Sequence, residues 1–291
     1  VAAGNIFMGM TESPVLIKNY LPTMNRSEIF LVMVSGMGTI AGSVMGTYIG
    51  MLGGTDPAAK VLFATHLLSA SVMAVPGSIV LAKMLCPQTE EATDHVAISG
   101  KEKENSNILD AISSGTVTGV KLMTNIAAML LVFISLVALA NYITEGVIGR
   151  YTGLNDWIVK ITDGKAQGLT FQFILGVITS PFMWLIGVPS QDIMLVGSLL
   201  GQKTILNEFV AYFQLQQWKD AGLFMYEKSI LMSTYILCGF ANISSIGILL
   251  GGLGVLAPEK RGLISRIGLP AMIGGALVSV LSATIIGMIL G

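Results

Sequence analysis

The chain has 291 residues, of which 53% are hydrophobic and 11% charged, and its formal net charge is −1. A soluble domain usually carries about 25% charged residues, so this composition, with a mean hydropathy of +0.76, predicts an integral membrane protein. The lack of a basic excess argues against nucleic-acid binding. The two cysteines, Cys86 and Cys238, are too far apart in sequence to suggest a metal cluster or a disulfide framework.

The chain begins with Val1, and its first residues, VAAGNIFMGM, are typical of the interior of a helix. We therefore expect an N-terminal part of the protein to precede Val1.

Five stretches are long and apolar enough to cross a bilayer, which takes about 20 residues per helix. They are residues 29–51, 58–85, 120–143, 230–256 and 269–290. A further apolar stretch, 169–188, contains Pro181, which we expect to kink or end its helix. Residues 87–107 are polar and charged, which predicts a solvent-exposed loop, followed by an amphipathic helix from Ile108.

Lysine and arginine in the short loops predict the orientation of the spans. Their positions place residues 18–27, 86–117 and 257–268 in the cytoplasm. The first two spans are then joined outside the cell, whereas the last two are joined inside it. This difference predicts two copies of one unit inserted in opposite orientations.

Each predicted copy contains an acid that precedes a polar patch of small residues by about thirty positions. Glu12 precedes residues 39–42, and Glu208 precedes residues 242–245. A carboxylate inside a bilayer is costly unless it is paired or hydrated, and irregular backbone is tolerated there only against protein or water. Glu12 with the nearby Pro14, and Glu208 among polar neighbours, therefore predict the tips of two re-entrant hairpins. Interrupted segments in matching places of inverted repeats indicate a transporter binding site.

Glycines recur every fourth residue at Gly38, Gly42, Gly46 and Gly50. For the set as a whole this spacing favours close helix packing, whereas for residues 38–42 we expect an unwound helix whose carbonyls bind a cation. Hard cations prefer oxygen ligands. The site would combine Asn5, the Met8 carbonyl, Thr39 and the Ile40 carbonyl.

Asn242 and Ser245 form a polar island in an apolar span and, being three residues apart, should share a helix face. Alone, the pair would favour hydrogen bonding between helices. The matching island in the first copy favours a ligand site instead.

Four segments resemble the concentrative nucleoside transporters: GNIFMGMTESPVLIKNYLPTMNRSE, GTIAGSV, GVPSQDIMLVGSLLGQKTILNEFVAY and CGFANISSIGILLGGLGVLAPEKR. The resemblance covers nearly the whole chain. It implies an all-α, homotrimeric membrane protein in which inverted repeats each have a re-entrant helical hairpin and a broken transmembrane helix, beside scaffold helices. The first repeat of the transport domain would be residues 1–86, a cytoplasmic loop and scaffold helices 87–187, and the second repeat 188–291. The resemblance also implies elevator-type import of nucleosides, such as uridine, across the inner membrane, driven by an inward cation gradient.

Matching positions carry the family's functional residues over to this chain. Those implied to bind substrate are Thr11, Glu12 and Val44 near the nucleobase, and Glu208, Phe240, Asn242 and Ser245 near the ribose. The implied sodium ligands are Asn5, Met8, Thr39 and Ile40, the second and fourth through backbone oxygens. Met10 stands where many members have glutamine, so base selectivity would depend on water or Glu12. Asn5 with the Thr39 hydroxyl favours sodium over protons.

Other functions remain open at this point. A proton-coupled nucleoside carrier and a carrier of free nucleobases are alternatives within transport, and a passive channel would not accumulate solute. A membrane-embedded enzyme would need paired acids or a metal cluster at one membrane face. The sequence shows no such cluster, nucleotide-binding loop or nucleophile elbow, so neither catalysis nor a cofactor besides the coupling ion is expected.

Overall fold

The computed structural model describes residues 1–90, 107–162, 164 and 166–291. The chain forms two compact units, one of Val1–His95 with Gln172–Gly291 and one of Val96–Phe171. Most of the predicted loop 87–107 lies outside the described residues.

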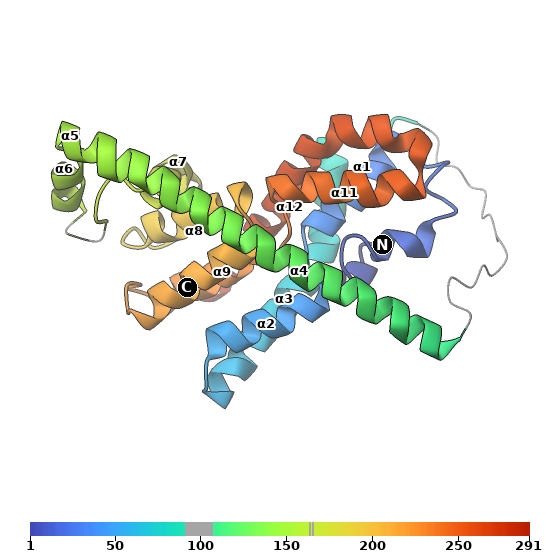
Figure 1. Ribbon diagram of the computed structural model, residues 1–291, viewed down its shortest axis with the longest axis horizontal. Coiled ribbons are helices and arrows are strands. Elements are labelled where there is room, and N and C mark those ends of the chain that lie inside the picture. The colour runs from blue at the N-terminus through green and yellow to red at the C-terminus, as the bar shows by residue number, and fades with distance from the viewer. Residues whose placement is uncertain (91–106, 163, 165) are drawn as a thin grey trace. The chain divides into compact units, whose positions relative to one another are not determined.

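The described residues are helical in both units (Figure 1). The helices of the first unit are α1 (Arg26–Met37), α2 (Gly42–Gly53), α3 (Pro57–Leu85), α7 (Phe171–Leu185), α8 (Ile193–Ile205), α9 (Glu208–Asp220), α10 (Glu227–Leu237), α11 (Ile243–Leu256) and α12 (Arg261–Ile289). The second unit contains α4 (Ile108–Asn141), a π-helical segment η3 (Tyr142–Gly149), α5 (Arg150–Thr152) and α6 (Leu154–Ile161).

Within the described ranges, three stretches are long and apolar enough to cross a membrane: Arg26–Gly53, Pro57–Leu85 and Pro258–Ile289. They overlap the predicted spans 29–51, 58–85 and 269–290. The predicted span 120–143 falls largely within α4, and 230–256 consists of α10 and α11. Pro181 lies inside α7, which continues to Leu185, so of the two expected effects, a kink or an end, the proline does not end its helix.

Two of the spans are broken in the middle. The first break lies between α1 and α2 at residues 38–41, which confirms the predicted unwinding, and the second lies between α10 and α11. The four half-helices have 12, 12, 11 and 14 residues. At 1.5 Å per residue each is roughly 16–21 Å long, which is shorter than the ~30 Å hydrocarbon layer. Each broken helix therefore has two helix ends inside the membrane.

The two breaks cross each other in close contact. The backbone N–H of Phe240 donates to the Thr39 carbonyl at 3.2 Å. A Cβ atom at Gly239 would lie 2.9 Å from the Met37 carbonyl oxygen, so only glycine allows this approach. Both repeats thus contribute backbone to one region at the centre of the first unit.

The glycine series is closely packed at its N-terminal end. Cβ atoms at Gly38 and Gly42 would lie 3.1 Å from a Val278 methyl and 3.0 Å from the Phe7 carbonyl. At Gly46 and Gly50 a Cβ atom would meet no described atom within 4 Å.

The second hairpin consists of α8 and α9, which pack side by side (Figure 1). Each has 13 residues, about 20 Å of helix. The buried Asp192 carboxylate, at the start of α8, accepts from the N–H groups of Met225 and Tyr226 at 3.0 and 3.1 Å. Because these residues follow α9, the hairpin begins and ends on the same side, as a re-entrant hairpin must.

The first hairpin tip is a tight turn rather than a helix end. The N–H groups of Glu12 and Ser13 both donate to the Gly9 carbonyl, at 3.2 and 3.1 Å. Short 3-10 turns precede and follow it, η1 (Gly4–Ile6) and η2 (Ser13–Ile17). Pro14 lies in the first turn of η2, where its missing N–H has no partner to lose.

The start of α1 and the end of α3 lie together. Asn25 caps α1 in a reciprocal pair: its side chain accepts from the Glu28 N–H at 3.0 Å, and the Glu28 carboxylate accepts from the Asn25 N–H at 2.9 Å. The Ser27 hydroxyl donates to the Cys86 carbonyl at 2.7 Å. The start of α1 and the end of α3 therefore lie on the same side of the first unit.

Replacing Asn25 with alanine should destabilise the protein by about 1 kcal/mol, because an orphan helix N–H loses its acceptor. Thermal unfolding in detergent measures the loss. Asn25→Ser is the control, since serine also caps helices and should restore most of the stability. Equal unfolding temperatures for wild type and Asn25→Ala would contradict the prediction.

Candidate functional site

The predicted acid of the second hairpin is buried at the place where the repeats meet. Glu208 is 6% exposed and is the first residue of α9. The Tyr48 hydroxyl, from α2, donates to one carboxylate oxygen at 3.2 Å, and the Asn242 amide donates to the other at 3.1 Å. The carboxylate is therefore held by one residue from each repeat.

Two helix N-termini converge on this carboxylate. Asn207 caps α9 by accepting from the Val210 N–H at 2.9 Å. Asn242 caps α11 in the same way, and its side-chain oxygen accepts from both the N–H and the hydroxyl of Ser245, at 2.9 and 3.0 Å. The positive end of a helix stabilises a nearby anion, so both caps favour a carboxylate here.

Asn242 and Ser245 do meet, but not for the predicted reason. The Asn242 backbone is extended, at φ −140° and ψ 167°, and the residue precedes the helix. The two side chains contact each other across a helix cap rather than along one face of a continuous helix.

Tyr48 was missed by the sequence analysis. Its ring is fully buried and stacks on Tyr212, with ring centroids 4.1 Å apart and an interplanar angle of 24°. The Tyr212 hydroxyl donates to the Thr234 carbonyl at 2.8 Å. A signal existed in the sequence, because Tyr48 follows the predicted Val44 by four residues and therefore shares its helix face.

The predicted cation ligands include an unsatisfied oxygen. Asn5 is fully buried, and its amide nitrogen donates to the Ser35 hydroxyl at 3.2 Å. Its side-chain oxygen has no hydrogen-bond partner among the described residues. Buried polar atoms are nearly always paired, so this oxygen suits a bound cation. Ser35 was not predicted.

The other predicted ligands lie around the first break. Thr39 and Ile40 are buried in it, and the Thr39 hydroxyl donates to the Ser35 carbonyl at 3.1 Å. The Phe7 carbonyl, next to Met8, accepts from the Gly42 N–H at 3.0 Å. The first hairpin thus supplies the acceptor for the first amide of α2, which has no side-chain cap.

The remaining predicted residues fall into different environments. Met10 is buried, and a Cβ atom at Gly36 would lie 2.9 Å from its Cβ, so it packs on α1. The Thr11 side chain lies against α11 at Gly252. Val44 and Phe240 are partly buried and pack on the apolar cluster that contains Tyr48.

Glu12 differs from Glu208. It is exposed, and its carboxylate folds back so that a Cβ atom at Gly9 would collide with it. Glu208 is therefore paired with protein donors, whereas the Glu12 carboxylate is exposed and lies against the turn at Gly9.

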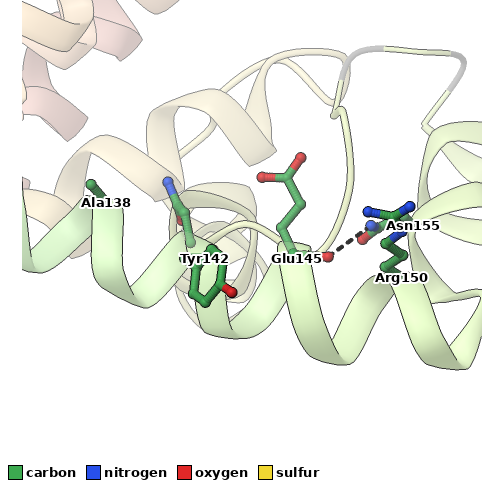
Figure 2. Close-up of a pocket in the computed structure, with 7 residues that line it drawn as sticks. Ala138, Tyr142, Glu145, Arg150 and Asn155 are labelled. Carbon is green, nitrogen blue, oxygen red and sulfur yellow. Dashed lines mark hydrogen bonds between the residues drawn. The ribbon is translucent and has the colours of Figure 1, made fainter.

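A hollow of about 370 Å³ lies in the second unit, where η3 follows α4 (Figure 2). The Asn155 side chain donates to the Glu145 carbonyl at 3.0 Å and accepts from the Leu169 N–H at 2.9 Å. The Glu145 carboxylate projects away from Asn155 (Figure 2). None of the predicted site residues lines this hollow, and Asn155 serves to hold the local fold.

Comparison with known proteins identifies the family. Residues 66–287 match the family described as Na+ dependent nucleoside transporter C-terminus. The chain is 40% identical to an uncharacterised transporter of Haemophilus influenzae, covering 100% of this chain and 65% of that protein. It is 38% identical to the nucleoside permease NupC of Helicobacter pylori, covering 100% of this chain and 64% of that protein. It is 39% identical to the sodium/nucleoside cotransporter 1 of Rattus norvegicus, covering 99% of this chain and 43% of that protein.

Solved structures agree with these relatives. CNTnw in an inward-facing substrate-bound state has a TM-score of 0.84 and 37% identity, covering 99% of this chain and 63% of that one. A CNTnw variant in an outward-facing state has a TM-score of 0.86 and 36% identity, with 99% and 64% covered. The predicted all-α fold of inverted repeats is confirmed by this similarity.

The relatives are named as transporters or permeases rather than enzymes. The chain spans about 65% of the length of the first bacterial relative. It is a multi-pass membrane protein, and it belongs to the Na+ dependent nucleoside transporter family.

Proposed function

We propose that the protein imports nucleosides, such as uridine, by symport with sodium. The observation that carries this proposal is the buried Glu208 carboxylate, held by donors from both repeats at a hairpin tip. An ionised acceptor in a water-poor site forms strong, charge-assisted hydrogen bonds with hydroxyl groups. The two hydroxyls of a ribose fit such an acceptor.

The coupling ion would bind at the first break. The unpartnered Asn5 oxygen, the Thr39 hydroxyl and the carbonyls of Met8 and Ile40 form an oxygen donor set, which suits sodium. The sodium/nucleoside cotransporter names of the mammalian relatives support the same ion.

Substrate would bind between the two predicted repeats. Glu208, Asn242 and Ser245 would contact the ribose, with Phe240 beside it, and Thr11, Glu12 and Val44 would contact the nucleobase. The buried Met10 would act by packing behind the first tip.

The repeats, residues 1–86 and 188–291, would move together as a transport domain against a scaffold within 87–187. The grouping of Val1–His95 with Gln172–Gly291 in one compact unit supports this division. We propose an elevator-type movement of that domain in a homotrimer within the lipid bilayer.

Uptake of labelled uridine into proteoliposomes tests the proposal, with an inward sodium gradient, an inward proton gradient and no gradient compared. We expect uridine to accumulate above its equilibrium concentration only when the inward sodium gradient is present. Accumulation driven by protons would make the carrier proton-coupled, and equilibration without accumulation would indicate a channel. Inhibition by uracil as strong as that by unlabelled uridine would exclude ribose recognition.

Tyr48→Phe should raise the KM for uridine about fivefold with little change in maximal rate, since one hydrogen bond of about 1 kcal/mol that orients Glu208 is lost. The phenylalanine ring keeps the stack on Tyr212. Tyr212→Phe is the matched control: it loses a hydroxyl that bonds the Thr234 carbonyl and should lower stability without changing KM. An unchanged KM in Tyr48→Phe would contradict this role.

A further inference from the structure

Lys203 is a buried cation that the proposed mechanism leaves unused. It lies on α8, five residues before Glu208, and is fully buried. Its ammonium group donates to the Ile236 carbonyl at 2.8 Å and to the Ser279 hydroxyl at 2.9 Å. The Ser279 hydroxyl in turn donates to the Cys238 carbonyl at 3.1 Å. The ammonium is thus bonded, directly and through one hydroxyl, to the backbone where α10 ends.

This arrangement satisfies groups that a broken helix leaves open. The last carbonyls of a helix have no partner within it, and the negative end of the helix dipole lies there. Ile236 is in the last turn of α10, and the N–H of Phe240, which would bond its carbonyl in a continuous helix, donates to Thr39 instead. Lys203 supplies the missing donor and a positive charge.

The first repeat has a polar residue in the corresponding place but no cation. Asn5 precedes the acid of its hairpin by seven residues, as Lys203 precedes Glu208 by five. Asn5 reaches the last turn of α1 at Ser35, as Lys203 reaches the last turn of α10. Among the described residues Lys203 is the one buried basic side chain, and the Asn5 oxygen is left without a partner.

We infer that Lys203 is a tethered cation for the second repeat, in the position that the coupling cation would take in the first. This inference rests on the proposed cation site at Asn5. It gives the two broken helices different roles. The first break would bind and release its cation in each transport cycle. The second break carries a permanent cation, Lys203, which crosses the membrane with the protein in both directions. Lys203 therefore adds nothing to the net charge moved per cycle.

The test is to replace the tethered cation with a free one. Lys203→Ala should leave a cavity that methylammonium can enter, so 100 mM methylammonium should raise the unfolding temperature of this variant by a few degrees. Wild type should show no such rise. Lys219→Ala, which removes a partly exposed lysine paired with Asp220 on α9, is the control and should not respond. Lack of a response in a folded Lys203→Ala variant would overturn the inference.

Transport gives a second readout. Lys203→Met keeps much of the side-chain volume without the charge and should lower uridine uptake at least about tenfold, because the carbonyl ends of α10 lose their charged donor. Methylammonium should restore uptake in Lys203→Ala but not in Lys203→Met, whose side chain fills the cavity. Full uptake by Lys203→Met would show that volume alone matters and would overturn the inference. The thermal response needs no nucleoside, so it stands apart from the proposed function, which fails if wild type does not take up uridine.

Discussion

Glu208→Gln is expected to reduce uridine uptake about a hundredfold while the protein remains folded, because the two charge-assisted hydrogen bonds that we propose between Glu208 and the ribose lose their ionised acceptor. The substitution preserves the size of the side chain. It removes the charge that two helix N-termini and two donors surround.

The neighbours of Glu208 make the change more severe than an exposed substitution would be. Tyr48 and Asn242 each donate to one carboxylate oxygen. Glutamine has one acceptor oxygen and one NH2 group, so it can accept from Asn242 only if its NH2 group faces the Tyr48 hydroxyl, which must then turn to accept instead of donate. The site would have to rearrange before any ribose could bind.

Uptake rates and nucleoside binding are the measurements, and size-exclusion profiles with unfolding temperatures establish that the variant is folded. Glu227→Gln is the matched control: Glu227 is exposed at the start of α10, and its variant should transport at the wild-type rate. In wild type, 2′-deoxy and 3′-deoxy analogues should compete with labelled uridine less strongly than unlabelled uridine does. In Glu208→Gln, loss of either hydroxyl should make no such difference. Uptake by Glu208→Gln near the wild-type level would remove this residue from the binding site.

The sequence was sufficient to predict the elements whose signal is local. Glycine and polar residues at 38–42 interrupt an apolar span, and the structure breaks there, between α1 and α2. The second break, at residues 238–242, lies largely before the polar island 242–245, for which a shared helix face was expected. The second hairpin was predicted from Glu208 within an apolar stretch, because a carboxylate there needs partners. These features follow from the cost of polar groups in lipid and need no knowledge of distant contacts.

The unpredicted parts depend on contacts between residues far apart in the sequence. Tyr48 and Glu208 are 160 residues apart, and the sequence around either residue does not predict its contact with the other. Ser35 and Lys203 lie in apolar helices without a motif of their own, and their partners become visible only when the repeats are folded together.

Asn5→Ala should raise the sodium concentration for half-maximal uridine uptake about tenfold, equivalent to ~1.4 kcal/mol of binding free energy. The substitution removes the buried amide oxygen that has no partner among the described residues. It also removes the bond to Ser35, which holds the first hairpin against α1. Uptake measured over a range of sodium concentrations, at saturating uridine, reports the change.

Asn25→Ala separates this effect from a general loss of stability. Both variants lose an asparagine that contacts α1, but Asn25 caps the start of the helix, far from the break at its other end. Asn25→Ala should therefore unfold at a lower temperature and keep the wild-type sodium dependence, whereas Asn5→Ala should show the shifted dependence at every temperature at which it is folded. If both variants shifted equally, the Asn5 effect would reflect weakened packing of α1. If Asn5→Ala kept the wild-type sodium dependence, the cation would have to bind elsewhere. In the described part of the chain, no other predicted ligand has a buried side-chain oxygen without a partner.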